Sequence, residues 1–341
     1  PRLDSSAASD VYKRQASGSA VPSPVLGIAI ARFGQRGVQS AVALDWVAAR
    51  FSDPDPATRE AAAYYVSRIP LQSWTRLLPA AQEALVNAAP DDPAAMYLAL
   101  GIGVGGLTDD EPLLVEVMER SVDWRIRVNA ALGLGRPTPT PGTRAALLRA
   151  LDDPSPRVRV AAATALSVAR ELPPSDLQAL VERMGADPGL TGPEDPDHDP
   201  SGAWQVPATL AAAVARAGRM GVVVQWMDRW VGGPPAPRMA GANALGLAPD
   251  PLATDQLVEL VDDEDPAAAG AAMRALARRW LVLARRGEDP SAALGWFSRG
   301  VNSGSFAVVS PAASALASEP FLSLGAADTL LGWLADEHHG S

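Results

Sequence analysis

A glycine-rich stretch, Gly101-Ile102-Gly103-Val104-Gly105-Gly106, matches the G-x-G-x-x-G pattern of dinucleotide-binding sites. Such a site needs a strand before the motif, a helix that begins inside it and an acidic residue about twenty positions later. Here residues 94–100 read as a helix, and the next helix begins only near Pro112. We therefore predict that the glycines end a helix and bind no nucleotide, and that the protein holds no cofactor.

Carboxylates gather in a second stretch, residues 187–202, with the sequence DPGLTGPEDPDHDPSG. This composition is too rich in Pro, Gly and Asp for a helix, so we expect an exposed loop inserted between helices. Glu194, Asp195 and Asp197 are oxygen ligands of the kind that calcium prefers, but their spacing fits no known calcium loop. We interpret the segment as a solvated loop available for partner contacts, with a weak cation site as the alternative.

The concentrated basic stripe of the chain lies near its C-terminal end. Arg274, Arg278 and Arg285 fall near one side of a predicted helix, with Arg279 and Arg286 beside them. The chain has 29 basic and 39 acidic side chains and a net charge of −10, which disfavours general attraction to nucleic acid. A solvated face or interhelix pairing is the first interpretation, a site for an acidic protein partner is the second, and a nucleic-acid site is the third. We name Arg274, Arg278 and Arg285 as candidate partner-binding residues.

Residues for catalysis and metal binding are scarce. The chain has no cysteine and three histidines, two of which, His338 and His339, stand in the C-terminal tail. A metal site needs three or four convergent ligands, and neither a G-x-S-x-G elbow nor a Ser-His-Asp order is present. We predict no metal, no enzymatic activity and no membrane span, because no apolar run approaches about 20 residues. We expect a cytoplasmic location. Residues 5–15 resemble translated adaptor sequence, and if they are, the native N-terminus and any targeting signal in it are missing from this sequence.

The elements that must position these residues are best seen in residues 143–170, TRAALLRALDDPSPRVRVAAATALSVAR. Apolar residues recur at helical spacing on both sides of an Asp/Pro-rich turn, Asp152-Asp153-Pro154-Ser155-Pro156. Proline stops the first helix, while Pro156 fits the first turn of the second, where its missing N–H costs nothing. Two helices this short cannot bury their own apolar faces. Copies of the pair must therefore stack.

Similar pairs recur along the chain about 30 to 50 residues apart, as in stacked helical repeats. Each predicted second helix opens at an anchor residue and then carries small side chains, which let neighbouring helices approach closely. The anchors are Pro56, Pro93, Trp124, Pro156, Pro207, Pro237, Pro266 and Phe306.

This pattern resembles the HEAT-repeat family, in particular its short bacterial form related to phycobilisome-lyase-type repeats. The residues that carry the resemblance are turn aspartates and an arginine in the second helix: Asp53-Pro54-Asp55-Pro56 with Arg59, Asp123 with Arg127, and Asp153-Pro154 with Arg159. The resemblance covers roughly residues 41–335 and is strongest over 108–172.

The resemblance implies a ladder between neighbouring repeats, formed by the turn aspartates and the second-helix arginines. Its residues here would be Asp55, Arg59, Asp123, Arg127, Asp153 and Arg159. In the other five copies the arginine position reads Met96, Leu210, Ala240, Ala269 and Val309. We therefore expect the ladder to be confined to the N-terminal half, and the C-terminal repeats to depend on apolar stacking.

These observations predict an all-α fold, an α-solenoid in the form of a right-handed superhelix of about eight HEAT-like helical hairpins. It would occupy residues 24–335, with the exposed insertion at 187–202, a disordered or non-native leader at 1–23 and a tail at 336–341. We expect a non-catalytic scaffold that binds a protein partner through the concave face made by the second helices. The resemblance leaves open an alternative, an enzyme-associated role of the chromophore-lyase type.

Overall fold

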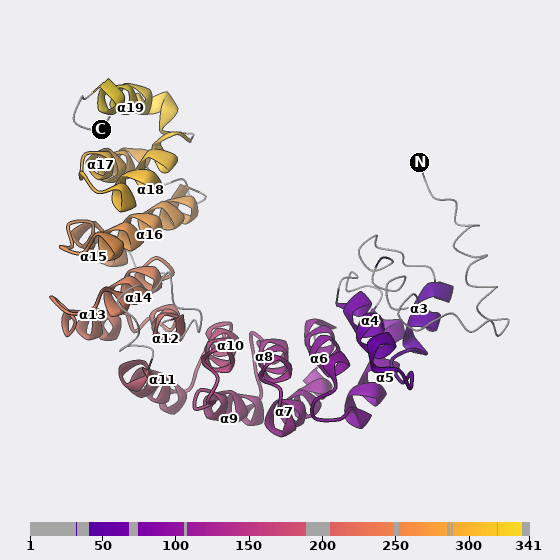
Figure 1. Cartoon of the computed structure of the whole chain (residues 1–341). Helices are drawn as coiled ribbons and strands as arrows, with labels where there is room; N and C mark the ends of the chain where they lie inside the picture. Colours follow the sequence, from indigo (N-terminus) through magenta and orange to yellow (C-terminus); the bar gives the residue numbers. More distant parts are fainter. Residues whose placement is uncertain are drawn as a thin grey trace, which may run out of the picture. The chain divides into compact units, whose positions relative to one another are not determined.

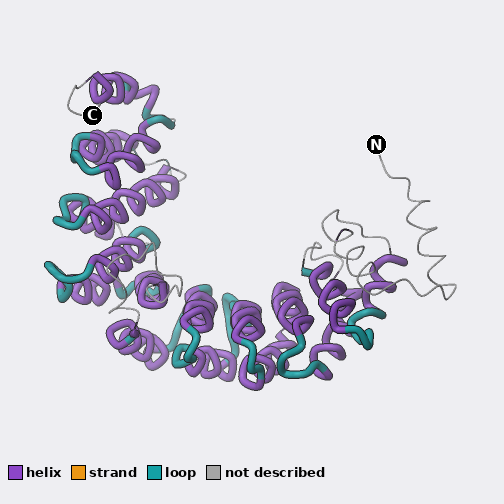
Figure 2. Tube along the Cα trace, viewed as in Figure 1, coloured by secondary structure: helices purple, strands orange, loops and turns teal. Residues whose placement is uncertain are grey.

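The computed structural model describes Arg32 and residues 41–67, 74–105, 108–188, 205–248, 252–284, 287, 289–318 and 320–335. Over these residues the secondary structure consists of 17 α-helices and two short 3-10 helices, without a strand (Figure 2). The predicted all-α repeat fold is thereby confirmed. No helix in these ranges combines the length and the apolar character that a membrane span requires.

First and second helices alternate along the chain, and within each of its two compact units a first helix packs on the second helix that follows it as a hairpin. One further helix follows the last second helix. The first helices and that final helix are α3 (Ala41–Ala48), α5 (Trp74–Asn87), α7 (Glu111–Arg120), α9 (Pro141–Ala150), α11 (Pro174–Ala186), α13 (Met220–Asp228), α15 (Leu252–Leu260), α17 (Pro290–Val301) and α19 (Ala326–Ala335). The second helices are α4 (Pro56–Val66), α6 (Pro93–Gly105), α8 (Trp124–Gly133), α10 (Pro156–Ser167), α12 (Gln205–Arg216), α14 (Pro235–Leu245), α16 (Pro266–Ala284) and α18 (Phe306–Leu316). The 3-10 helices are η2 (Thr108–Asp110) and η5 (Leu322–Leu324).

Six of the eight second helices begin at the predicted anchor residue. The other two begin two residues earlier than predicted, α12 at Gln205 instead of Pro207 and α14 at Pro235 instead of Pro237. Proline is tolerated throughout the first helical turn, because the N–H groups there have no partner within the helix. A proline therefore marks the first turn of a helix without fixing which of its residues comes first.

The chain divides into two compact units, residues 1–150 and residues 151–341. In the first unit α4, α6 and α8 lie side by side in one layer, and α5, α7 and α9 lie in the other (Figure 1). In the second unit α10, α12, α14, α16 and α18 form the corresponding layer, each packed on the next second helix along the chain. Each unit thus exposes one long face made only of second helices.

Aspartates cap the second helices and shape the turns before them. The Asp55 carboxylate accepts a hydrogen bond from the Thr58 amide at 2.9 Å, with Pro56 in the first turn of α4. Before α16 the Asp265 carboxylate likewise accepts from the amides of Ala267 and Ala268, at 2.9 and 3.0 Å. Such caps satisfy N–H groups that have no partner inside the helix. Aspartates of these turns therefore cap the starts of α4, α6, α8 and α16.

The buried sides of the second helices carry small residues, which permits close helix packing. In α10, for example, Ala161, Ala162 and Ala163 are almost fully buried. The closest approach in the first unit joins α6 and α8. A Cβ atom added at Gly103 would lie 2.1 Å from the Cα atom of Gly133. Two glycines are required at this crossing because the backbones themselves are in contact.

This contact explains the G-x-G-x-x-G pattern. The helix α6 continues through Gly105, past the expected end at residue 100, so Gly101, Gly103 and Gly105 are helical residues. Gly101 is buried, and Gly103 packs against α8. No strand precedes the motif in the described residues, and Gly103 acts in helix packing.

The substitution Gly103→Ala tests this packing. We expect it to lower the free energy of unfolding by about 1–3 kcal/mol, because the added methyl group meets backbone that cannot move aside alone. The midpoint of urea unfolding, followed by far-ultraviolet circular dichroism, measures the loss.

The matched control is Gly105→Ala in the same helix, where an added Cβ meets no atom within 4 Å. Its stability should stay unchanged or rise slightly, since alanine favours the helix. Equal destabilisation by both substitutions would contradict the proposed role of the Gly103–Gly133 contact.

Candidate functional site

A partly buried arginine near the start of a second helix joins two successive turns of the first unit. Arg59, in the first turn of α4, donates from Nη1 to the carbonyl oxygens of Asp53 and Pro54, at 2.8 and 3.2 Å. From Nε it donates to Asp92 Oδ2 at 2.9 Å. Asp92 lies in the turn before α6, and its other oxygen, Oδ1, accepts from the Ala94 amide at 3.0 Å. One guanidinium thus holds its own turn and the turn of the next hairpin.

Arg159 repeats this arrangement in the second unit. Its Nη1 donates to the carbonyl oxygen of Asp153 at 3.0 Å, and its Nε donates to Asp187 Oδ2 at 3.1 Å. Arg159 and Asp187 are each only 8% exposed. Asp187 therefore does not belong to an exposed insertion, as the composition of 187–202 had suggested. It ends α11 and is buried because it binds the arginine of α10.

The aspartates named from the sequence mainly organise their own turns. Asp55 caps α4, and Asp123 caps α8 by accepting from the Arg125 amide at 2.8 Å. The Arg125 side chain also donates to Asp123, which holds the pKa of that carboxyl below its usual value. Asp153 Oδ1 accepts from the Ser155 amide at 2.8 Å. Arg127 donates to two carbonyl oxygens of its own turn, those of Ser121 and Val122, at 3.1 and 2.9 Å.

The expectation that the C-terminal repeats lack the ladder arginine is wrong at α14. Because α14 begins at Pro235, its fourth residue is Arg238, the position that Arg59 holds in α4. Arg238 Nη1 donates to the Trp230 carbonyl at 2.8 Å, and Nε lies 3.1 Å from Asp263 Oδ2 in the turn before α16. The side chains are 4% and 9% exposed. The anchor taken at Pro237 had placed Ala240 in this position and hidden the arginine.

A second buried polar cluster fixes the start of α7 in the first unit. Glu111 is 1% exposed, and its Oε1 lies 3.4 Å from Arg136 Nε. Its Oε2 accepts from the Thr140 amide at 3.2 Å and from the Thr143 hydroxyl at the start of α9. The carboxylate thereby joins α7 to the loop before α9. It has a structural role that the sequence patterns did not indicate.

The second-helix face of the first unit carries aromatic, apolar and basic side chains. The rings of Tyr64 in α4 and Tyr97 in α6 meet edge to face, with centroids 5.3 Å apart. Arg125 in α8 lies close enough for the Tyr97 and Glu60 side chains to raise its pKa, although the main cause is its hydrogen bond with Asp123. Val104, two turns after Tyr97 on α6, is 52% exposed.

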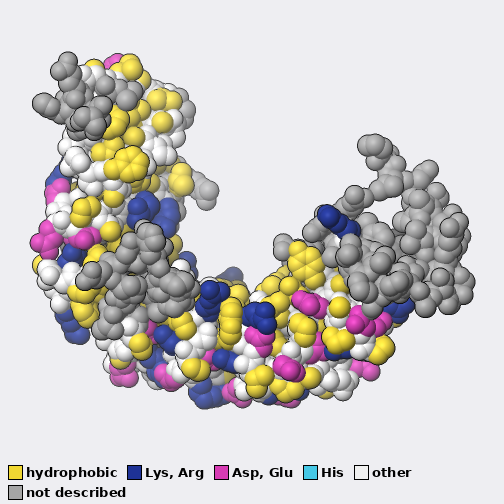
Figure 3. Space-filling view, in the orientation of Figure 1, with side chains coloured by type: hydrophobic (Ala, Val, Ile, Leu, Met, Phe, Trp, Pro, Cys, Tyr) yellow, Lys and Arg dark blue, Asp and Glu magenta, His cyan; other side chains and the backbone are white. Residues whose placement is uncertain are grey.

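On the second-helix face of the second unit, arginines predominate. Arg216 of α12 donates to Ser167 Oγ at 2.9 Å, and Arg278 of α16 donates to Asn243 Oδ1 of α14 at 2.5 Å. Figure 3 shows dark blue side chains gathered over α14 and α16. Within the described ranges no carboxylate forms an ion pair with Arg216, Arg274 or Arg278. Partial desolvation of the guanidinium, and the nearby charge of Arg274, lower the pKa of the exposed Arg278.

The other predicted binding residues are placed differently. Arg279, expected beside the stripe, is 5% exposed and donates to Thr254 Oγ1 at 2.5 Å and to the Ala248 carbonyl. It is therefore a structural residue. Arg285 lies outside the described residues, as do Glu194, Asp195 and Asp197 of the insertion. Among the side chains that the structure does describe, none form a group of three or more potential metal ligands.

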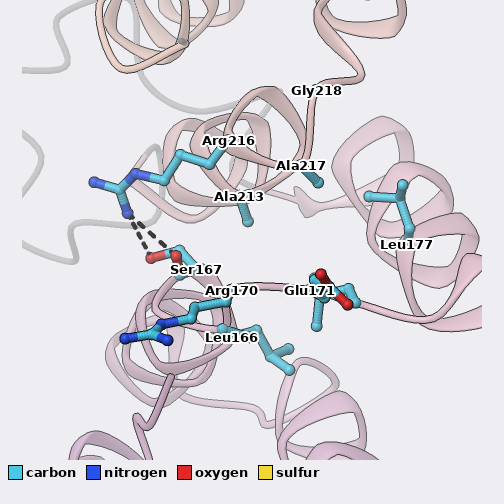
Figure 4. A pocket seen from close by; sticks show the side chains of 11 residues that line it. Leu166, Ser167, Arg170, Glu171, Leu177, Ala213, Arg216, Ala217 and Gly218 are labelled. Atoms are coloured by element: carbon cyan, nitrogen blue, oxygen red, sulfur yellow. Dashed lines mark hydrogen bonds between the residues drawn. The ribbon is translucent and has the colours of Figure 1, made fainter. Parts of the chain in front are cut away.

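A pocket of about 500 Å³ lies in the second unit, where α10 and α12 end and α11 begins. Arg170 and Arg216 extend to the same side of it, with Ser167 between them and Glu171 farther along (Figure 4). The last carbonyl groups of a helix carry partial negative charge, which basic side chains at the helix end offset. Arg216 donates to the Ser167 carbonyl at 3.5 Å, so we interpret it as a partner of the end of α10.

The paired helices, linked by arginines between successive turns, define an α-helical repeat protein. Residues 111–191 match the family model of HEAT repeats, which confirms the prediction of HEAT repeats and covers α7 to α11. No curated protein sequence matches the chain.

Solved structures of low sequence identity align with the chain. An engineered protein aligns over 96% of this chain and 95% of its own, with 17% identity and a TM-score of 0.40. Two structures of the karyopherin Kap121p, bound to the SUMO protease Ulp1p and to Nup53p, align over 85% of this chain and 35% of their own. Their identities are 16% and 17%, and their TM-scores are 0.44 and 0.43.

The substitution Arg159→Met tests the energetic weight of the ladder. It leaves the buried Asp187 carboxylate without its cation, so we expect a loss of about 3 kcal/mol in the free energy of unfolding. The double substitution Arg159→Met/Asp187→Ala should recover part of that loss, because no buried charge remains unpaired.

The exposed ion pair Arg183–Asp152, at 2.6 Å in the same repeat, supplies the control. Arg183→Gln should cost at most about 1 kcal/mol, since exposed pairs contribute little. Similar urea midpoints for Arg159→Met and Arg183→Gln would contradict the ladder's importance.

Neighbouring arginines of α16 give a second comparison. A lowered pKa means that the folded state holds the Arg278 proton less firmly than the unfolded chain, so this charge opposes folding at neutral pH. We expect Arg278→Gln to leave stability unchanged or to raise it by about 0.2–0.5 kcal/mol, the cost of a like-charged pair one turn apart. Arg279→Gln should instead lower the free energy of unfolding by about 1–3 kcal/mol, because the Thr254 hydroxyl and the Ala248 carbonyl lose their buried donor. The midpoint temperatures of thermal unfolding compare the two variants. A larger loss of stability for Arg278→Gln than for Arg279→Gln would contradict this interpretation of α16.

Proposed function

We propose that this protein is a non-catalytic scaffold that binds a protein partner across its second-helix faces. The observation that carries the proposal is the combination of aromatic, apolar and basic side chains on these faces. The first unit has the partly exposed Tyr64 and Tyr97 with the exposed Val104 and Arg125, and the second has arginines without an ion pair among the described residues. Tyrosine, tryptophan and arginine dominate the binding energy of protein interfaces.

The structural residues and the outward-facing residues of the helices are different, which supports this proposal. The turns supply the carboxylates Asp92, Asp187 and Asp263, and arginines in the first turn of second helices bind them in the ladder. The second helices bury alanine and glycine toward their neighbours and present larger side chains outward. Stacked repeats of this kind create an extended surface that a partner chain can follow. The function proposed is therefore recognition by shape and side-chain contact.

Affinity capture with the full tagged chain from lysate of the source organism, followed by mass spectrometry, tests the proposal. Two matched variants locate the contact. Val104 on α6 and Val86 on α5 are similarly exposed, 52% and 54%, but lie in a second and a first helix. We expect Val104→Glu to reduce capture of the main partner about tenfold, because it buries a charge in the interface, and Val86→Glu to leave it unchanged.

Three results would contradict the proposal. Capture could yield no specific partner, or Val86→Glu could reduce capture as strongly as Val104→Glu. The purified protein could also carry a pigment that absorbs visible light, which would favour the chromophore-lyase alternative.

A further inference from the structure

Exposed leucines and unpaired arginines meet where α14 and α16 pack together. The set consists of Asn243, Leu247, Arg274, Arg278 and Leu281, which we call the α14–α16 patch. Leu247 and Leu281 are 41% and 59% exposed, and Arg274 and Arg278 are exposed as well. Charged and apolar groups thus share one surface of the second unit.

Contacts between α14 and α16 hold the patch together. Arg274, Arg278 and Leu281 follow one another at intervals of four and three residues, so they lie on the same side of α16. The Arg278 guanidinium donates to Asn243 on α14. A Cβ added at Gly246 would lie 2.8 Å from the Ala275 Cβ, which places the adjoining Leu247 against the same stretch of α16. The arginines therefore lie near Leu281 of α16 and Leu247, which follows the end of α14.

The charge of the patch is uncompensated, which distinguishes it from other arginines of the unit. Arg183, Arg238 and Arg299 pair with Asp152, Asp263 and Asp262. Arg274 and Arg278 have no such partner among the described residues, and they lie one helical turn apart, where like charges repel. The lowered pKa of Arg278 reflects partial desolvation of its guanidinium and this repulsion. Because arginine stays protonated in proteins, an incoming anion is what would relieve the repulsion.

We infer that the α14–α16 patch binds an acidic amphipathic segment of a partner protein, with two carboxylates spaced to meet Arg274 and Arg278 and an apolar residue set between Leu247 and Leu281. This inference rests on the proposed scaffold function and names the chemistry of its partner. Guanidinium groups bind carboxylates through paired N–H donors. The exposed leucines supply apolar contact beside them. A long polyanion fits less well, since the whole chain carries a net charge of −10 and would repel it.

A direct binding measurement uses the full chain and three fluorescein-labelled probes. The first is a peptide of about 15 residues, long enough for helix formation, with Glu one turn apart and Leu on the same face. The second replaces every Glu by Gln, and the third is an oligo(dT) strand. Fluorescence anisotropy reports binding to the native protein, to Arg274→Gln/Arg278→Gln and to the control Arg219→Gln/Arg229→Gln. The control removes two exposed arginines at the ends of the first helix α13.

The Glu peptide should bind the native protein and the control equally. It should bind the Arg274→Gln/Arg278→Gln variant about tenfold more weakly, because two charge contacts are lost. Binding should also weaken between about 50 and 300 mM salt, as screening increases. The Gln peptide should bind the native protein about as weakly as the Glu peptide binds the patch variant.

The inference is overturned if no Glu-peptide binding is detected, if the Gln peptide binds equally well, or if the two double variants behave alike. Tighter binding of oligo(dT) than of the Glu peptide would assign the patch to nucleic acid instead. If the patch variant captures the main partner as well as the native protein does, the scaffold proposal stands but the α14–α16 patch is not its binding site. Loss of all specific capture by the native protein would remove the scaffold proposal itself.

Discussion

The arginine fork between successive turns is the interaction on which the stacking of this protein depends. The guanidinium has donors in a planar, fixed arrangement, so one side can meet carbonyl groups while the other meets a carboxylate. Arg59, Arg159 and Arg238 use it in this way, each from the fourth residue of a second helix. Because the acceptor lies in the next hairpin's turn, each fork sets the position of one hairpin on the next.

Small residues make the fork geometrically possible. A carboxylate about thirty residues away in the chain reaches the arginine only if adjacent second helices approach closely. At α6 and α8 that approach is backbone to backbone, at Gly103 and Gly133. Alanines have the corresponding place elsewhere, as in α10. The same close packing leaves the outward sides of the second helices free for larger side chains, which is why the candidate binding residues lie there.

Local patterns were sufficient to predict the helices but not the contacts between them. Proline and aspartate act on their own turn, so most second-helix starts followed directly from the sequence. The acidic partners Asp92, Asp187 and Asp263 were missed, because which carboxylate meets an arginine depends on how hairpins stack. Arg238 was missed for a simpler reason: two prolines in one turn left the register of α14 open. Periodicity likewise put Arg278 and Arg279 side by side without showing that one is exposed and the other buried.

Oxidative footprinting of the protein with its captured partner tests the central claim, that the second-helix faces are the binding surface. Hydroxyl radicals modify accessible tyrosine, leucine and tryptophan side chains, and a bound partner shields them. We predict shielding of Tyr97 on α6, and of Leu281 on α16, with unchanged modification of Leu331 on the final helix α19. Shielding of the first helices and α19, with full modification of Tyr97 and Leu281, would contradict the account.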